Sequence, residues 1–350
     1  MNNSAKKSLA IALINVLFIT SVISQNVVIP DNNFKAALIA APNSVDVNTD
    51  GEIQYSEAQV ITSLYLINKS ITNLTGIEAF SGLEVLDCSN NQITSLNLTS
   101  NTALKQLFCG SNDIITLNIS SNVLLEDLWC YSNNISTIDI STNTALLNFY
   151  CYNNLLTSIN TSNNTALAKF DCNNNDITSL DLSNNNALIE LDCDNNLINN
   201  LTFSQNSNLL KLWCYSNKLV SINVSKNSAL QELHCYNNLL TSLDVRNNNY
   251  ITYLSCVSNP SLQNICVNNT QLGLTTSNPT SWKKDNTATW STNCTSDIAD
   301  YNDFNKPLTI INTFNLLGQI VNSNQLEDGI YINQYNNGMF KKIIISSHNK

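Results

Sequence analysis

A cysteine recurs every 21 residues through the middle of this chain, and this period constrains the fold more than any other feature. An aliphatic residue stands five positions before each of these cysteines, Leu or Phe stands two before it, and Asn stands three after it. A unit of this length cannot bury an apolar face alone, but stacked units share one continuous core. The period therefore predicts a solenoid. Its nine cysteines are Cys88, Cys109, Cys130, Cys151, Cys172, Cys193, Cys214, Cys235 and Cys256.

The repeat L-x-x-L-x-C-x-x-N resembles that of the leucine-rich-repeat family, with Cys in the last core position of the strand. The resemblance covers residues 64–262 and implies a right-handed superhelix of 21-residue coils. The convex segments are short and rich in Thr and Ser, so we expect turns or very short strands there. The predicted fold is thus a β-dominated solenoid. In each coil the Asn after the Cys, and a second Asn in the column Asn101 to Asn248, are expected to bond the backbone at the bends.

The cysteine column permits a metal or redox interpretation as the alternative to simple packing. Cys is small and readily buried, and every position of the column faces the predicted core. No C-x-x-C spacing occurs, and no His joins the column. We therefore expect nine buried free thiols. In one coil Thr161 replaces the apolar residue of the other repeats, and we expect poorer packing there.

The first 24 residues have the pattern of a signal peptide. Lys6 and Lys7 precede an apolar run over residues 8–22, and small residues stand before Gln25. The alternative is an uncleaved membrane anchor, for which the run is short because a span needs roughly 20 residues. We therefore expect an exported protein that has no membrane span after cleavage.

Residues 25–63 are expected to form a small helical cap on the first coil. Within them, residues 46–57 match the calcium loop D-x-[DN]-x-[DN]-G-x5-E at every required position. Helical spacing of Phe34, Ala37 and Leu38 before the loop, and a short helix capped by Ser56 and running through Ile61 after it, would flank this site. We expect one structural Ca²⁺; the alternative is an acidic turn that arose by chance. The predicted ligands are Asp46, Asn48, Asp50 and Glu57 through their side chains and Glu52 through its carbonyl oxygen.

Residues 263–296 are expected to cap the other end of the solenoid. Cys266 and Cys294 lie outside the 21-residue period and bracket a stretch that contains Trp282 and Trp290. In an exported chain the natural interpretation is a disulfide between the two cysteines. The alternative is that each packs as a free thiol.

Residues 297–350 carry a different, β-like pattern. The segments 316–321, 326–331 and 341–345 contain L-G-x-x-V, L-x-x-G-I-Y and K-K-I-I. This resembles the C-terminal sorting domain of the type IX secretion system of Bacteroidetes-type bacteria, although the usual opening Y-P-N-P element is absent. The resemblance implies a small β domain, passage through the type IX secretion machinery, and a secreted or outer-membrane-surface location. The alternative is an ordinary terminal β-module.

Alternate residues of the predicted strands face outward on the concave side, directly before and after each Cys. Adjacent coils place like positions about 4.8 Å apart. Exposed aromatic columns are unusual on a soluble surface and are typical of binding sites; the alternative is that the rings only shield the sheet. The candidate ligand-binding residues are Phe108, Trp129, Tyr131, Tyr150, Tyr152, Asp171, Asp192, Asp194, Trp213, Tyr215, His234 and Tyr236.

The sequence argues against enzymes and against nucleic-acid partners. Asp171 and Asp192 would lie at the separation that retaining glycosidases use, but column geometry alone produces that distance, and an open face offers no cleft to raise a pKa.

The formal net charge of the protein is -10. Binding of nucleic acid requires a basic surface, which an acidic protein of this kind does not provide. We therefore expect a secreted or surface binding protein whose concave face holds a protein or a carbohydrate. The alternative is a structural or adhesive envelope component without a single ligand.

Overall fold

The computed structural model describes residues 25–203, 206–294, 310–315, 319–321, 329–335 and 340–345. These residues form two compact units, one that ends at Asn293 and one that begins at Cys294. The predicted signal peptide (1–24) and residues 316–318 of the predicted sorting motif lie outside the described residues. No helix among the described residues is both long and apolar enough to cross a membrane.

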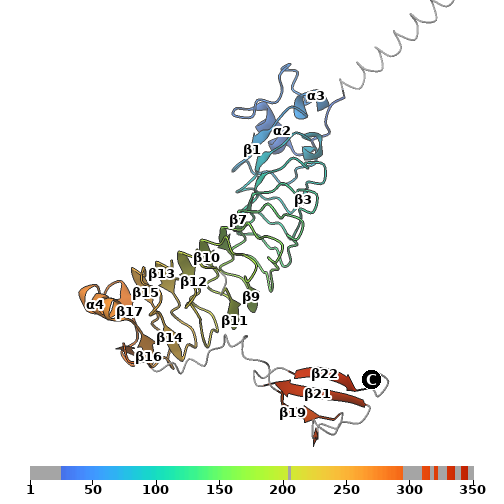
Figure 1. Ribbon diagram of the computed structural model, residues 1–350. Coiled ribbons are helices and arrows are strands. Elements are labelled where there is room, and N and C mark those ends of the chain that lie inside the picture. The colour runs from blue at the N-terminus through green and yellow to red at the C-terminus, as the bar shows by residue number, and fades with distance from the viewer. Residues whose placement is uncertain are drawn as a thin grey trace, which may run out of the picture. The chain divides into compact units, whose positions relative to one another are not determined.

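The first unit is a solenoid that places one short strand of each coil in an 11-stranded parallel sheet. The central residue of each strand is buried and points into the core, as Leu86 and Leu107 do. Figure 1 shows the long sheet along the inner, concave side of this unit. Its strands, in spatial order, are β1 (Ser63–Tyr65), β2 (Val85–Asp87), β4 (Gln106–Phe108), β6 (Asp127–Trp129), β7 (Asn148–Tyr150), β8 (Lys169–Asp171), β10 (Glu190–Asp192), β12 (Lys211–Trp213), β13 (Glu232–His234), β15 (Tyr253–Ser255) and β17 (Trp282–Lys283).

Apart from a short 3-10 helix in the first coil, the described convex segments carry turns and short strands, which confirms the prediction from their Thr- and Ser-rich sequence. These strands form small parallel sheets of two or three strands. They are β3 (Ser95–Asn97), β5 (Thr116–Asn118), β9 (Ser179–Asp181), β11 (Asn200–Thr202), β14 (Ser242–Asp244), β16 (Asn264–Cys266) and β18 (Thr289–Ser291).

The core is one continuous apolar cluster that runs through all the coils. The nine cysteines of the period are buried, with 0% exposure, and free, as the sequence predicts. Burial raises the pKa of each thiol, to about 12 for Cys130. A neutral thiol is a poor nucleophile and a poor metal ligand. We therefore assign the nine cysteines the role of filling the core.

Both Asn columns bond the backbone at the bends, as predicted. In the first column Asn112 donates from Nδ2 to the carbonyl oxygens of Cys88 (3.0 Å) and Cys109 (3.1 Å), and its Oδ1 accepts from the amide of Ile93 (3.0 Å). In the second column Asn122 donates to the carbonyl oxygens of Leu98 and Asn101. These bonds satisfy buried polar groups that the bends would otherwise leave unpaired.

The expectation of poorer packing in the coil of Thr161 stays a prediction, but this residue is itself buried and hydrogen-bonded. Thr161 is only 1% exposed, and its hydroxyl donates a hydrogen bond to Oδ1 of Asn185 in the next coil. The polar residue therefore occupies the apolar column without leaving its oxygen unsatisfied.

The N-terminal cap contains helix α2 (Asn32–Ile39), capped by Asp31, and buries Phe34, Ala37 and Leu38, as predicted. Helix α3 (Tyr55–Ala58) differs from the prediction, because Gln54 and not Ser56 occupies the N-cap, and the helix ends at Ala58 and not Ile61. Gln54 and Glu57 form a reciprocal capping box that sets this start. A short 3-10 helix, η1 (Ile77–Ala79), follows within the first coil.

Asn43 protects the edge of the long sheet at the same end. Its side-chain oxygen accepts from the amide of Tyr65, and its Nδ2 donates to the carbonyl oxygen of Tyr65, each at 2.9 Å. Because the Asn43 amide occupies these backbone groups, they cannot pair with a strand of another molecule.

The C-terminal cap contains a helix that the sequence analysis did not anticipate, α4 (Asn269–Ser277). Gln271, in this helix, donates to the carbonyl oxygens of Val245 and Asn248 and so takes over the role of the second Asn column. Asp285 accepts from the amides of Ser258 and Asn259, both at 2.9 Å, where a further coil would otherwise supply carbonyl oxygens. Cys266 and Cys294 are both disulfide-bonded.

The second unit contains an antiparallel sheet in the strand order β20-β19-β21-β22. Its segments 329–331 and 341–345, which carry part of the predicted sorting motifs, lie in the two longest strands. The strands are β19 (Ile310–Phe314), β20 (Ile320–Val321), β21 (Gly329–Tyr335) and β22 (Phe340–Ile345).

Candidate functional site

The structure places the predicted ligand-binding residues in two parallel columns on the concave sheet. The register pairs each residue that precedes a ladder Cys with its counterpart in the next coil, so that Trp129 lies opposite Tyr150 and Asp171 lies opposite Asp192. The chain leaves each strand through a residue with positive φ, such as Ser132 at 50° and Asn195 at 46°. This bend ends the outward-facing stretch at the same point in every coil and keeps the columns aligned.

An N-terminal aromatic cluster is formed by Phe108, Trp129, Tyr150, Tyr131 and Tyr152. The Trp129 ring meets Phe108 and Tyr150 edge to face, with centroids 4.9 and 5.1 Å apart. Tyr131 and Tyr152 stack in parallel at 4.6 Å. The Tyr131 ring lies directly over Gly110, where a Cβ atom would come within 2.6 Å of the ring. Gly110 therefore provides the space that lets this ring lie flat against the sheet.

A C-terminal aromatic cluster is formed by Trp213, His234, Tyr253, Tyr215 and Tyr236. Trp213 meets His234 edge to face at 6.1 Å, and His234 stacks on Tyr253 at 4.6 Å. Tyr215 and Tyr236 stack at 4.3 Å. The sequence analysis missed Tyr253, which precedes its Cys by three positions and also faces outward. The strand alternation that it used for the other columns would have found this residue.

An acidic cluster of Asp171, Asp192 and Asp194 lies between the two aromatic clusters. Nδ2 of Asn173 donates to Asp171 at 2.7 Å and to Asp192 at 3.4 Å, and so bridges two of the carboxylates. Oδ1 of Asp192 accepts from the backbone amide of Asp194 at 3.2 Å, and Oδ1 of Asp194 accepts from Nδ2 of Asn195 at 2.7 Å.

The nearby lysines do not neutralise this cluster. Lys169 and Lys211 both pair with Glu190, at 3.7 and 3.3 Å. Around the central coils, as far as the structure describes them, no ion pair reaches any of the three aspartates. Hydrogen bonds such as that from Asn173 therefore oppose burial and like charge only in part, and no lysine or arginine in an ion pair adds to them.

The pKa values of the acidic cluster are raised as a result, which corrects the expectation that an open face cannot raise a pKa. Burial raises the pKa of Asp171 to about 6. Burial, together with the charges of Asp194 and Asp171, raises the pKa of Asp192 to about 8. Burial lowers the pKa of His234, against the opposing effects of Glu232 and Asp194. Asp171 and Asp192 are half-buried and Asp194 is buried, so all three carboxyl groups are partly shielded from water.

An apolar stripe borders the central strands, and the sequence analysis missed it. It consists of the residues four positions before successive ladder cysteines, Leu147, Ala168, Ile189 and Leu210. Leu147 is 40% exposed and Ile189 is 37% exposed. Backbone hydrogen bonds join all four in sequence, from Ala168 to Leu147, Ile189 to Ala168 and Leu210 to Ile189, each 2.8 Å long. The stripe therefore lies along the same coils as the acidic cluster.

The predicted calcium loop brings its oxygen-bearing side chains together, but they bond to the loop itself. Asp46 accepts from the amides of Asp50 and Gly51, and Glu57 accepts from the amides of Val47, Asn48 and Gln54. Gly51 has the positive φ of 84° that the sharp turn requires. The side chain of Glu52 points elsewhere, to Lys35 at 2.6 Å, which leaves its carbonyl oxygen for the predicted role. Within the described residues, no group of three or more His, Cys, Asp or Glu side chains is arranged to hold a metal ion.

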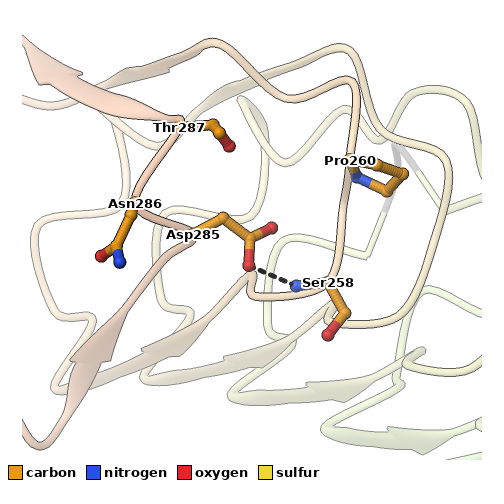
Figure 2. A pocket seen from close by; sticks show the side chains of 5 residues that line it. All are labelled: Ser258, Pro260, Asp285, Asn286 and Thr287. Carbon is orange, nitrogen blue, oxygen red and sulfur yellow. Dashed lines mark hydrogen bonds between the residues drawn. The ribbon is translucent and has the colours of Figure 1, made fainter.

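An open pocket of about 400 Å³ lies at the C-terminal cap, away from the concave columns. Figure 2 shows Asp285 at its centre, bonded to the backbone of Ser258. Because Asp285 is already engaged in capping the last coil, we assign this pocket a structural origin. Its other lining residues are Pro260, Asn286 and Thr287.

Comparison with known proteins supports the fold. No family model matches the chain. Internalin J of Listeria monocytogenes serotype 4b (strain F2365) is 41% identical over 73 residues, which are 21% of this chain and 8% of that protein. The solved functional domain of InlJ from Listeria monocytogenes, which includes a cysteine ladder, is 35% identical with a TM-score of 0.62. That match covers 68% of this chain and 55% of the solved chain.

More distant structures share the fold alone. The internalin inlF of Listeria monocytogenes matches with a TM-score of 0.54 at 19% identity, over 69% of this chain and 82% of that chain. A leucine-rich-repeat protein of Leptospira interrogans matches with a TM-score of 0.54 at 20% identity, over 61% of this chain and 62% of that chain. Together with the cysteine ladder and the parallel sheet, these findings establish that the repeat unit has the internalin-like leucine-rich-repeat fold.

Proposed function

We propose that this protein is a non-enzymatic binding protein that holds a protein ligand on its concave sheet. The observation that carries the proposal is the pair of aromatic clusters, because exposed Trp and Tyr side chains on a rigid sheet provide contact area at little entropic cost. Domains with the internalin-like fold typically mediate protein binding or adhesion, which supports the same conclusion.

The arrangement of the rings favours a protein ligand over a carbohydrate. Sugars bind aromatic residues by lying on the face of a ring. Here Tyr131 lies between Gly110 and Tyr152, and Tyr215 stacks on Tyr236, so that the faces which these rings turn toward one another are covered. The rings instead present edges and hydroxyl groups, which suit the mixed apolar and polar surface of a protein.

A second candidate function is a structural or adhesive role without a single ligand. The mutual stacking of the rings favours it, because stacked rings shield the sheet from water whether or not a partner is present. The two candidates differ in whether substitution of one ring abolishes a specific interaction.

Binding to protein and glycan arrays tests the proposal. Saturable binding to a protein that is lost in Trp129→Ala and Trp213→Ala supports it, since truncating an aromatic anchor costs about 2 kcal/mol or more. Thr94→Ala and Ser95→Ala, on the convex side, serve as controls and should leave affinity unchanged. Losses that map to the convex side or the caps would assign the rings to shielding. Binding confined to glycans would reject the protein ligand.

We also propose export, a secreted or outer-membrane-surface location and one structural Ca²⁺. The sequence of residues 1–24 supports export, and the motifs of residues 316–345 support passage through the type IX secretion machinery. The calcium proposal is supported by the loop pattern of residues 46–57 and by the positive φ of Gly51 at its sharp turn. If the residues hold Ca²⁺ when it is supplied, the ion would replace the loop's own amide contacts and fix the N-terminal cap.

A further inference from the structure

We propose that the concave face binds an extended protein segment with a basic side chain over the acidic cluster and an apolar side chain on each side of it. The apolar side chains would contact the N-terminal and C-terminal aromatic clusters. This inference rests on the proposed function and adds the chemistry of the partner.

The central coils present a sheet face that no other part of the repeat unit covers. Trp129 is 38% exposed there, and the apolar stripe adds exposed surface beside it through Leu147 and Ile189. Trp129 ends strand β6, whereas Leu147 and Ile189 directly precede strands β7 and β10, so the polar first residues of these strands separate the apolar stripe from the aromatic column. Exposed aromatic side chains on both sides of a polar centre are typical of an interaction site.

The charge of the repeat unit determines which partner fits. Residues 25–293 contain 10 Lys and Arg against 21 Asp and Glu. At the centre of the face the two available lysines are held by Glu190, which leaves the cluster without a cation. An arginine guanidinium can bond two carboxylates at once and is easily desolvated beside aromatic rings. A basic side chain of the partner therefore supplies what the face lacks.

The spacing along the column matches an extended segment. From Tyr150 to Trp213 the column advances three coils, which is about 14 Å at about 4.8 Å per coil. In an extended chain, residues i−2 and i+2 lie roughly 13 Å apart and point to the same side. A segment with the pattern apolar-x-basic-x-apolar would thus place its basic residue over Asp171 and Asp192 and its apolar residues at the two clusters.

Binding of a cation here should release a proton. A guanidinium or ammonium group favours the ionised carboxylates, so a proton held by Asp171 or Asp192 would pass to the solvent. Because the pKa values of Asp171 and Asp192 are raised, affinity should increase as the pH rises from about 6 to about 8. The other titratable and charged side chains that face the cluster from strands β7 to β13 are Tyr150, Lys169, Glu190, Lys211, Tyr215, Glu232 and His234.

Selection of a displayed library of random short peptides on the folded full-length protein at pH 8 tests the inference. We expect enrichment of peptides that place Arg or Lys between two apolar or aromatic residues. Their affinity should fall at least tenfold in the double variant Asp171→Asn/Asp192→Asn and at pH 5.5. The matched control is Asp139→Asn/Asp181→Asn, which removes the same charge from exposed convex positions. The control should bind as well as the unchanged protein.

The outcomes separate this inference from the proposed function. Selected peptides that lack a basic residue, or that bind the Asp171→Asn/Asp192→Asn variant unchanged, would overturn the inference. If their binding were still lost in Trp129→Ala, the concave binding face would stand with a different partner. A selection that yields no peptide, or only peptides insensitive to concave substitutions, would reject both. Circular dichroism of each variant establishes that the repeats remain folded.

Discussion

The hydroxyl of Thr161 donates a 2.8 Å hydrogen bond to Oδ1 of Asn185, 24 residues further along the chain. The equivalent oxygen has no hydrogen-bond partner in seven other members of the same column: Asn101, Asn122, Asn143, Asn164, Asn206, Asn227 and Asn248. In those coils an apolar residue stands where Thr161 stands. One polar substitution in the core thus satisfies an acceptor that the repeat pattern otherwise leaves unpaired.

Replacement of Thr161 by Val should therefore destabilise the protein, although Val is closer to the repeat pattern. The change removes one buried hydrogen bond, which contributes about 1 kcal/mol net to the free energy of unfolding. Urea unfolding of Thr161→Val should show a loss of about that size. Thr161→Ser keeps the hydroxyl, so this variant should keep the contribution of the hydrogen bond to the free energy of unfolding. An unchanged or increased stability of Thr161→Val would show that the bond contributes nothing.

A valine-to-threonine substitution in the same apolar column should be tolerated at Val224 but should destabilise the protein at Val245. In Val224→Thr the new hydroxyl would lie next to the unpartnered Oδ1 of Asn248, so we expect a change of less than about 0.5 kcal/mol. In Val245→Thr the following side chain is Gln271, whose oxygen already accepts from the amide of Asn268. The same substitution there should cost about 1–2 kcal/mol, because a buried hydroxyl lacks that acceptor. Equal losses at the two positions would contradict this explanation.

The thiol content should distinguish the ladder from the cap. Because the ladder cysteines are free and buried while Cys266 and Cys294 are disulfide-bonded, titration under denaturing, non-reducing conditions should detect nine thiols per chain. Reduction should also lower the free energy of unfolding by about 3–4 kcal/mol if the two cap cysteines close one loop. A count of eleven would show that the disulfide is absent, and a count below nine would show that ladder cysteines pair.

The period alone was sufficient to predict the solenoid, the buried cysteines and the bonding of both Asn columns. Repetition explains this success, because each residue is constrained by identical neighbours above and below it. The same logic placed Trp129, Tyr150, Trp213 and Tyr215 on the concave side. It did not predict the hydrogen bond of Thr161, because the period contains no information about the oxygen of Asn185 that this one hydroxyl meets.

The electrostatics of the face could not be predicted from the period. Column geometry places Asp171 next to Asp192, but it does not reveal that Lys169 and Lys211 are taken by Glu190. Nor does it reveal that the ring of Tyr215 comes next to Asp194, which is only 3% exposed. Side-chain conformations decide these contacts, and they are not encoded in the repeat spacing. The helix α4 and its Gln271 were missed because the cap lies outside the period.

Calcium should bind the N-terminal loop and stabilise the cap. From the ligand set we expect a dissociation constant of about 10⁻⁴ to 10⁻³ M, as in extracellular modules. Isothermal titration calorimetry should detect one site, and Asp46→Ala should abolish it. Asp139→Ala, an exposed convex substitution with the same charge change, should not. No heat on titration and no rise in melting temperature with Ca²⁺ would reject the site.

The stability of the repeat unit should decrease as the pH rises from about 5 to about 8. An unfolded Asp has a pKa near 3.9, whereas the pKa values of Asp171 and Asp192 in the folded protein are raised, to about 6 and about 8. Between these limits the folded state therefore binds more protons than the unfolded state. Stability is then greatest at low pH and is lost as the folded aspartates ionise. Allowing for solvent screening, we expect a loss on the order of 2 kcal/mol across this range.

Urea unfolding at a series of pH values measures this effect, and two isosteric variants isolate its origin. Asp192→Asn removes one ionisation from the cluster while keeping its shape, so the variant should be more stable than the unchanged protein at pH 8. Its stability should also vary less with pH. Asp181→Asn makes the same change on the convex strand β9 and controls for the general repulsion of an acidic protein. If both variants flattened the profile equally, net charge would be responsible. If neither did, Asp192 would not hold a proton in the folded state at neutral pH.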